Sequence, residues 1–208
     1  VTAKIAVGMA LEEIKIANTN AAFEPRLDYV IAKLPRFPFD KFTAASNALG
    51  TQMKATGEVM GIGATLEESL LKGIRSLEIG ANHLYLSKFD NMSVDELLDY
   101  IKEFRSDNIF AIAELIYHGV SLEKLHEVTM ITPYFLESFK KMVEMEKTIK
   151  ANPKDKETLI AAKKMGFGDK FIAKLWDMPE VEVFNMRKEN NIFPVYKMVD
   201  TCHTNAYI

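Results

Sequence analysis

Alternating apolar and polar residues predict two β-strands in the first third of the chain. Residues 28–35, DYVIAKLP, and residues 57–63, GEVMGIG, alternate as expected for strands with two different faces. In the second strand Glu58 shares a face with the apolar residues Met60 and Ile62. The pattern leaves two interpretations of Glu58: a solvated residue at the end of the strand, or a carboxylate that lines a polar passage.

An amphipathic helix follows the second strand, from Thr65 to about Ile79. Thr65 and Glu68 form the T-x-x-E pattern of a capping box, which satisfies backbone N–H groups of the first turn. Residues 1–14 also follow a helical rhythm, and residues 1–80 together are typical of the margin of an α+β domain. The apolar stripe of the helix after Thr65 consists of Leu66, Leu70, Ile74 and Leu77.

Strand signals vanish after Asn91, and short helices follow one another. We expect Ser93, Ser121 and Thr132 to begin three of these helices, and Gly166 to interrupt the pattern further on. Helices this short are unstable alone, so they should pack as one all-α bundle, which makes the protein mostly helical. The inward residues should be Val94, Leu97, Leu98, Ile101 and Phe104 after Ser93, and Phe135, Phe139, Met142, Val143 and Ile149 after Thr132.

The helical region carries many large apolar side chains for its length. We expect that one bundle does not cover all of them, and we therefore predict self-association through the region from Asn91 to Asn191. Residues 193–201, FPVYKMVDT, return to an extended character. The residues that suggest an apolar surplus include Phe110, Ile112, Leu115, Ile116 and Tyr117.

Composition narrows the classes of function. The chain has 208 residues and a formal net charge of −3, which argues against nucleic acid as its main partner. Its single cysteine, Cys202, excludes an internal disulfide and fits a reducing compartment. No apolar run approaches the roughly 20 residues of a membrane-spanning helix. The chain begins without methionine and already in helical rhythm, so we expect it to be part of a longer protein.

Common site motifs are absent or incomplete. Gly61 and Gly63 are not followed by the third glycine of a dinucleotide-binding turn, nor by the Gly-Lys-Ser/Thr of a P-loop. His118 and His126 lack cysteines or paired carboxylates at metal-ligand spacing, so we predict no metal site. Cys202 and the adjacent histidine should point to opposite faces of an extended chain, which makes a catalytic pair awkward.

A helix-turn-helix is the strongest alternative that local pattern offers. Residues 169–176 and 180–189, joined by a turn at Pro179, have the proportions of that motif. The second helix carries three glutamates against Arg187 and Lys188, so it lacks the basic face that contacts phosphates. We therefore do not expect DNA binding.

Four stretches in order resemble the large (synthetase) subunit of glutamine-dependent carbamoyl phosphate synthetase. They are FEPRLDYVIAKLPRFPFDKF, TQMKATGEVMGIGATLEESLLKGIRSLE, GFGDKFIAKL and VYKMVDTC, and together they span nearly the whole chain. The resemblance implies that residues 1–80 end the first ATP-grasp domain, which forms carboxyphosphate. It implies that residues 81–194 are the helical oligomerization domain and that residues 195–208 start the second synthetase half. The first half is preferred to its internal duplicate because the second should not lead into VYKMVDTC.

The resemblance implies a role in an ATP-dependent carbon–nitrogen ligase. The parent enzyme would make carbamoyl phosphate from bicarbonate, ammonia and two ATP, for arginine and pyrimidine biosynthesis in the cytoplasm. It would use Mg²⁺ or Mn²⁺ with ATP, a glutaminase (small) subunit that releases ammonia from glutamine, and homo-oligomeric contacts through the helical domain. Unstable intermediates would travel inside the protein. By similarity, Met53, Thr56 and Glu58 match residues that line the carbamate passage between the two active sites.

The family's nucleotide- and metal-binding residues should lie upstream of Val1. The resemblance therefore implies no catalytic, cofactor or metal residue in this span, and we expect no ATP or metal bound to it. Residues 203–208 depart from the small and acidic residues usual in the family. The alternative is a helical interaction module used only for oligomerization, with no role in the chemistry.

Overall fold

The computed structural model divides the chain into two units. Residues 1–28, with the described residues from Pro194 onward, form the first, and residues 29–193 form the second. The assignment of residues 1–80 to an ATP-grasp domain stays a prediction, as do the other two domain boundaries. The structure describes residues 1–16, 18–24, 27–39, 41–54 and 56–199.

The first unit holds short elements. The helix expected over residues 1–14 is interrupted, because the chain turns at Gly8 with a φ of 93°. No strand forms in the described part of the extended tail, residues 194–199, although Lys197 forms an ion pair with Asp28. Cys202 and the chain after it lie outside the described residues. The elements are α1 (Thr2–Ala6), η1 (Leu11–Glu13), β1 (Lys15–Ile16) and β2 (Thr19–Asn20).

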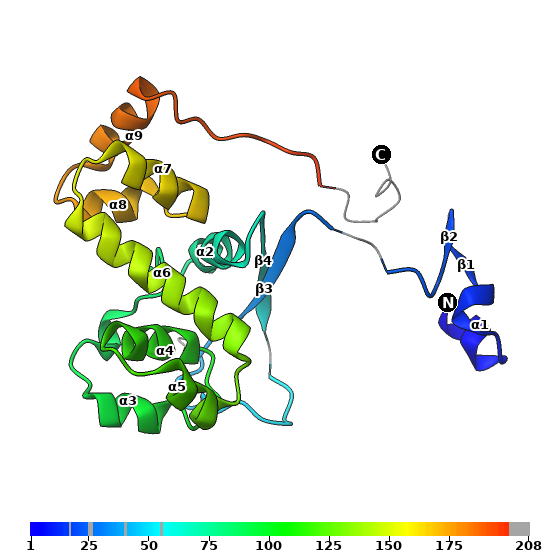
Figure 1. Cartoon of the computed structure of the whole chain (residues 1–208). Coiled ribbons are helices and arrows are strands. Elements are labelled where there is room, and N and C mark those ends of the chain that lie inside the picture. The colour runs from blue at the N-terminus through cyan, green and yellow to red at the C-terminus, as the bar shows by residue number, and fades with distance from the viewer. Residues whose placement is uncertain (17, 25–26, 40, 55, 200–208) are drawn as a thin grey trace. The chain divides into compact units, whose positions relative to one another are not determined.

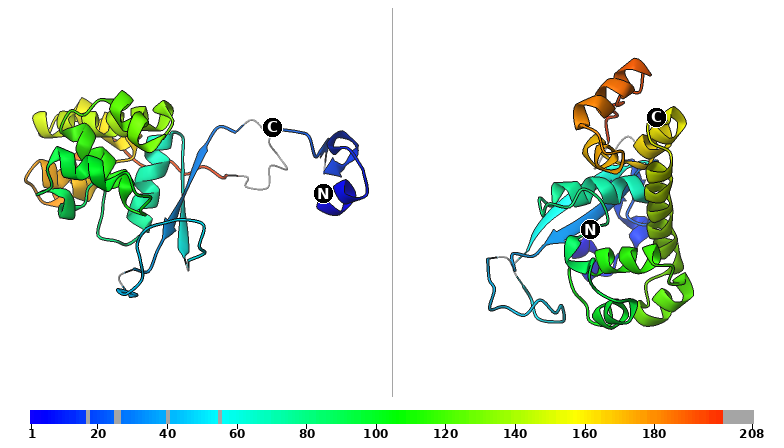
Figure 2. Two further views of the ribbon diagram at one scale, coloured as in Figure 1. Left: turned by 90° about the horizontal axis from the view of Figure 1, so that it is seen from below. Right: turned by 90° about the vertical axis from the view of Figure 1, so that its left-hand side faces the viewer.

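Both predicted strands of the second unit form, as an antiparallel hairpin. Strand β3 (Val30–Arg36) pairs with β4 (Gly57–Gly63), so that Ala32 lies opposite Gly61 and Pro35 opposite Glu58. The predicted alternation is confirmed, because Gly61 is buried while Glu58 on the other face is exposed. The hairpin with helix α2 (Leu66–Ser76) is here called the hairpin layer. Figures 1 and 2 show α2 between the two strands and the helices that follow it in the sequence.

Two glycines of β4 let α2 approach the strand closely. A Cβ atom added to Gly61 would lie 2.0 Å from the carbonyl oxygen of Ser69, and one on Gly63 would lie 2.8 Å from the Ser69 nitrogen. Gly73 of α2 permits the same close contact from the helix side, since a Cβ atom there would lie 2.6 Å from Leu34 Cδ1. These glycines therefore serve the contact between helix and strand, where a side chain would push the two apart.

A buried hydroxyl fastens α2 to both strands. Ser69 is fully buried, and its Oγ accepts a hydrogen bond from the Ala32 N–H and donates one to the Gly61 carbonyl, each 2.7 Å long. Ala32 and Gly61 are partners in the hairpin, so one side chain satisfies a donor of β3 and an acceptor of β4. This bridge is directional, unlike the apolar packing around it.

The remaining helices follow the sequence signals. Ser93 accepts a hydrogen bond from the Glu96 N–H, Ser121 accepts one from the Lys124 N–H, and Gly166 ends a helix with a φ of 102°. Hence the predicted starts at Ser93 and Ser121 are confirmed. These elements are here called the helical part: η2 (Ser87–Phe89), α3 (Val94–Tyr100), α4 (Asn108–Tyr117), α5 (Leu122–Thr129), α6 (Pro133–Ala151), α7 (Lys156–Met165), α8 (Asp169–Leu175) and α9 (Glu180–Glu189).

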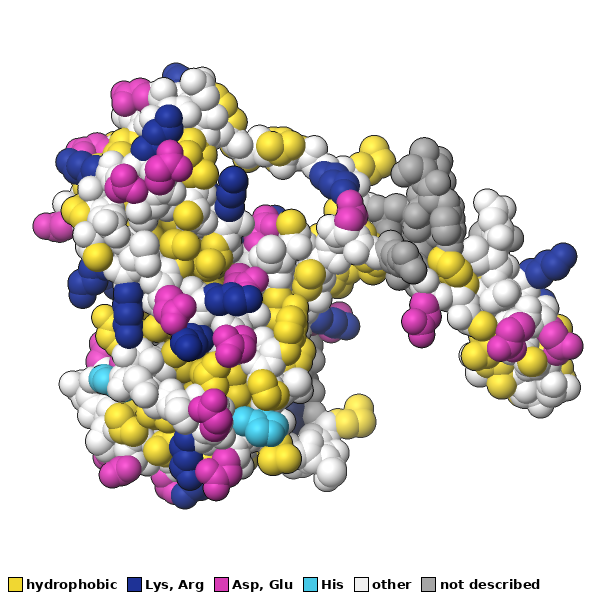
Figure 3. Space-filling model, in the orientation of Figure 1, with side chains coloured by type: hydrophobic (Ala, Val, Ile, Leu, Met, Phe, Trp, Pro, Cys, Tyr) yellow, Lys and Arg dark blue, Asp and Glu magenta, His cyan; other side chains and the backbone are white. Residues whose placement is uncertain are grey.

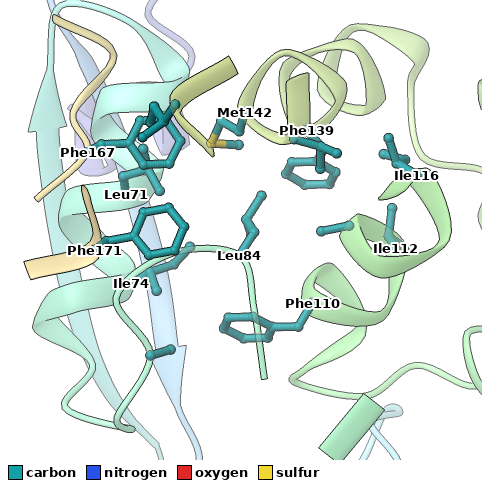
Figure 4. Packing of buried hydrophobic residues seen from close by; sticks show 14 of the residues in the cluster. Leu71, Ile74, Leu84, Phe110, Ile112, Ile116, Phe139, Met142, Phe167 and Phe171 are labelled. Carbon is teal, nitrogen blue, oxygen red and sulfur yellow. The ribbon is translucent and has the colours of Figure 1, made fainter. Parts of the chain in front are cut away.

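One hydrophobic core joins α2 to the helical part. Leu71 and Ile74 of α2 have no exposed surface, and Figure 4 shows them beside Phe167 and Phe171. The predicted stripe omitted Leu71, because α2 is covered on two sides, by the strands and by the helices. A helix covered on two sides buries more than one amphipathic stripe.

Two expectations about inward side chains were wrong. Phe104 is 72% exposed, because α3 ends at Tyr100, one turn too early to carry it inward. Phe135 is 44% exposed in the first turn of α6, where Leu136 is buried instead. The large apolar residues of α4 are all buried or half-buried except for Tyr117, so the exposed apolar side chains of the region from Asn91 to Asn191 lie mostly elsewhere. The exposed apolar side chains include Met130, Tyr134 and Phe135 at the α5–α6 turn and Val181 and Phe184 on α9.

Within the described part of the chain, no helix combines the length and apolar character needed to cross a membrane.

The Ser69 bridge predicts a large effect from removing one oxygen. Ser69→Ala leaves the Ala32 N–H and the Gly61 carbonyl buried without this partner, so we expect a loss of roughly 1–3 kcal/mol in the free energy of unfolding. Urea titration followed by circular dichroism measures it. Ser76→Ala is the matched control, since Ser76 lies on the same helix, is exposed, and bonds only to the Lys72 carbonyl of the preceding turn. Equal effects from the two variants would contradict the prediction.

Candidate functional site

The three residues expected to line a passage lie on the exposed side of the hairpin layer or just before it. Met53 is 96% exposed, Thr56 is exposed, and the Glu58 side chain is 59% exposed at the start of β4. Met53 and Thr56 precede the strand in a segment without regular structure. They are thus near Glu58 in sequence, and their assignment to a passage stays a prediction.

Glu58 is paired with a cation that the sequence reasoning did not connect to it. Lys33 Nζ of β3 lies 2.9 Å from Glu58 Oε2, and both side chains are equally exposed. The pairing follows from the register, because Pro35 lies opposite Glu58 and Lys33 is two residues away on the same face. An exposed pair contributes little stability, about 0–1 kcal/mol. Its consequence is electrostatic: this face presents opposite charges side by side, flanked by Ile31 and Met60.

A hollow of about 700 Å³ opens elsewhere in the second unit. It lies between the end of β3, the segment after it and the start of α4, and its walls include Arg36, Arg105 and Asp107. Neither Glu58 nor the other two candidate residues belongs to its lining. The hollow therefore does not support the expected passage.

Two cations hold the loop of residues 166–168, which ends α7 and faces α2. Arg75, in the last turn of α2, donates from Nη1 to the Gly166 carbonyl at 2.8 Å. Lys163, on α7 itself, donates to the Phe167 carbonyl at 2.8 Å. Gly166 also permits a close approach, because a Cβ there would lie 2.9 Å from Glu68 Cα. Burial lowers the pKa of the Arg75 guanidinium, and the nearby Glu68 carboxylate opposes that effect.

A half-buried carboxylate connects the last three helices. Asp169, the first residue of α8, accepts hydrogen bonds from Arg187 Nε and Nη2 of α9 and from Lys163 Nζ of α7 at 2.6–3.0 Å. Burial by itself raises the pKa of Asp169, but the bonds from Arg187 and Lys163 outweigh it and lower the pKa below its usual value. Helices α8 and α9, which have the proportions of a helix-turn-helix, are therefore fixed to each other by an internal ion cluster.

The two histidines considered as metal ligands serve separate local contacts. His118 Nε2 lies 3.1 Å from Glu114 of the same helix, whereas His126 Nδ1 lies 2.7 Å from the Ile131 carbonyl. Among the residues described, no three His, Cys, Asp or Glu side chains are grouped as a metal site. On the face seen in Figure 3, acidic and basic side chains are interspersed over the helical part.

The second unit is a helical bundle that shares its core with a small hairpin layer. A family model described as "Carbamoyl-phosphate synthetase large chain, oligomerisation domain" matches residues 58–191, roughly two thirds of the chain. The chain belongs to this family, which is part of a ligase. The resemblance inferred from the sequence is thereby confirmed, and the match begins at Glu58.

The Asp169 cluster predicts a pH-dependent contribution to stability. A lowered pKa in the folded state stabilises the fold above the unfolded pKa of about 3.9, and this contribution is lost as the pH falls through the folded value. Asp169→Asn should therefore cost roughly 3 kcal/mol at pH 7, where Lys163 and Arg187 lose their charge partner. The cost should shrink markedly near pH 2.5, about 1.4 units below the unfolded value. Urea unfolding at both pH values measures it.

Asp99→Asn is the control for that experiment. Asp99 pairs with Lys102 at 2.9 Å, but both side chains are largely exposed. We expect this variant to change stability by less than about 0.5 kcal/mol at either pH. An Asp169→Asn cost that is the same at pH 7 and pH 2.5 would show that the carboxylate charge is not what stabilises the cluster.

Proposed function

We propose that this chain is a segment of a carbamoyl phosphate synthetase large subunit that joins a passage for carbamate to a domain for subunit contact. The match over residues 58–191 carries the proposal, because it places the helical part in that protein. In the parent enzyme, one synthetase half would form carboxyphosphate from bicarbonate and ATP. Ammonia would convert it to carbamate, and the second half would phosphorylate carbamate with another ATP.

The exposed face of β4 supports a role for Glu58 in the passage. Carbamate is an anion, so a wall with a lone cation would hold it, and a wall with a lone carboxylate would repel it. The Lys33–Glu58 pair does neither strongly, since its charges offset each other at 2.9 Å. A conduit needs such weak interactions, because its cargo must leave as easily as it enters. The other walls would come from the rest of the parent chain.

The proposal assigns ATP, Mg²⁺ or Mn²⁺ and the catalytic residues to the rest of the parent enzyme. The described residues offer no cluster of metal ligands, and the sequence lacks the glycine patterns that cradle phosphates. We place no step of the chemistry on this chain. We also propose that the parent enzyme receives ammonia from a glutaminase subunit, serves arginine and pyrimidine biosynthesis, and lies in the cytoplasm.

The alternative function is a contact module without a part in the chemistry. The exposure of Met53 and Glu58 favours it, since a surface residue with a weak ion pair is ordinarily replaceable. The two functions differ in what a charge reversal at Glu58 does to the parent enzyme.

Glu58→Lys in the parent enzyme tests the passage. The variant places a second cation beside Lys33, so carbamate should be held or obstructed there and decompose before it is used. We expect bicarbonate-dependent ATP hydrolysis and ATP synthesis from carbamoyl phosphate to stay within about threefold, while overall synthesis falls by about tenfold or more. All three rates are measured on one preparation.

Lys33→Met is the control, because it removes the ion pair and leaves Glu58 in place. If it matches Glu58→Lys, the lost pair and not the new charge is responsible. A parallel fall of all three rates in Glu58→Lys would indicate misfolding, and three unchanged rates would favour the contact module.

Self-association is the second property to test. The family is named for oligomerisation, and exposed apolar side chains such as Met130 and Tyr134 remain on the helical part. We expect sedimentation velocity of the 208-residue chain to show reversible dimers or larger species at about 100 μM, a concentration suited to weak contacts. A single monomer boundary at the highest concentration would contradict this.

A further inference from the structure

We propose that Arg75 is a positioning residue, which fixes the helical part against the hairpin layer and so sets the place of the strand that carries Glu58. Its effect on catalysis rests on the proposed passage, whereas its effect on position does not. A directional contact crosses this seam, the hydrogen bond from Arg75 to the Gly166 carbonyl, two residues 91 positions apart in sequence. An ion pair between Lys141 of α6 and Glu67 of α2 also crosses the seam, but at 3.8 Å it is longer than a hydrogen bond.

The apolar part of the seam is extensive. Leu71 and Ile74 pack beside Phe167 and Phe171, and this burial is not directional, although the close approach of Gly166 to Glu68 limits movement across the seam. The Arg75 bond, 2.8 Å long, fails when the geometry changes by a fraction of an ångström. Gly168 lies under the same side chain, since a Cβ there would be 3.6 Å from Arg75 Cδ.

On its other side, α2 is bound to the strands with equal precision. The Ser69 hydroxyl joins Ala32 of β3 to Gly61 of β4, and Gly61 leaves no free space between strand and helix. Glu58 lies three residues before Gly61 on β4. A shift of α2 relative to the loop of residues 166–168 is therefore a shift of Glu58 relative to the helical part.

Lys163 offers a matched comparison. Like Arg75, it is a half-buried cation that donates to a carbonyl of the same loop at 2.8 Å. It lies on α7, however, and its second bond goes to Asp169 Oδ1 at 2.9 Å, so both of its bonds stay within the helical part and do not cross to α2. Loss of Lys163 should weaken contacts within the helical part, and loss of Arg75 should loosen the seam to α2.

The first experiment measures position in the 208-residue chain. Spin labels at Met60→Cys on β4 and Lys164→Cys on α7, both exposed sites, report the distance across the seam by pulsed electron resonance, with Cys202→Ser removing the native thiol. We expect Arg75→Met to broaden the distance distribution at least twofold and Lys163→Met to leave it unchanged. Arg75→Lys, which keeps one donor toward the carbonyl, should restore most of the narrow distribution.

The second experiment measures coupling in the parent enzyme, with ammonium chloride as the nitrogen source so that glutaminase activity does not matter. Small misplacements at a site can cost up to about 100-fold in rate. We expect Arg75→Met to lower overall synthesis at least fivefold relative to the two partial reactions, with Arg75→Lys near the native ratio and Lys163→Met at that ratio.

The outcomes separate the two proposals. An unchanged distance distribution in Arg75→Met, or equal broadening in Lys163→Met, overturns the positioning role. So does a fall of all three rates together, which is the effect of lost stability alone. If the distribution broadens and the coupling ratio stays native in both Arg75→Met and Glu58→Lys, position is set by Arg75 but the passage proposal fails. Should Arg75→Met not fold, the same comparisons are made with Arg75→Gln, which keeps polar donors on a shorter stem.

Discussion

The second unit depends on the burial of α2 between two different partners. One side of the helix meets a two-stranded hairpin, which would be marginal by itself, and the other side contributes Leu71 and Ile74 to the core of the helical part. The sheet side requires glycines for close approach and a serine for the backbone groups of the strands. The bundle side requires aliphatic side chains. Neither layer can be removed without exposing one face of this helix.

Three polar contacts of the second unit add directional bonds between elements to the apolar packing. Ser69 fixes helix to strands, Arg75 fixes helix to loop, and Asp169 fixes the last three helices to one another. Each donor or acceptor is buried or half-buried, so each bond is costly to leave unmade. The proposed function uses this rigidity, because a passage wall on β4 is useful only when its position relative to the rest of the enzyme is fixed.

The exposed face of the hairpin layer has a different character. Lys33 and Glu58 are accessible and flanked by the exposed apolar residues Ile31 and Met60, so the face combines an ion pair without net charge with exposed apolar surface. Such a face suits a wall that is completed by other parts of a parent chain. The family match identifies the large chain of carbamoyl phosphate synthetase as that parent, and the proposed passage would assign a function to the ion pair.

The sequence by itself determined the local structure and the family. Period-two alternation identified both strands, capping residues at Thr65, Ser93 and Ser121 marked helix starts, and the ordered stretches identified the carbamoyl phosphate synthetase large chain. These features succeed because caps and periodicity act over a few residues, within reach of a sequence pattern. The pattern also left Glu58 with two interpretations, since alternation shows which residues share a strand face but not whether that face is covered.

Only the tertiary structure decided which faces are covered and which distant groups meet. Leu71 is buried because α2 has partners on two sides, and Phe104 and Phe135 are exposed because the helices around them end or begin too soon. The Lys33–Glu58 pair required a strand register. The Arg75–Gly166 bond required two segments 91 residues apart to meet. These contacts arise from packing between elements, and the local pattern around each residue is the same whether or not its partner is present.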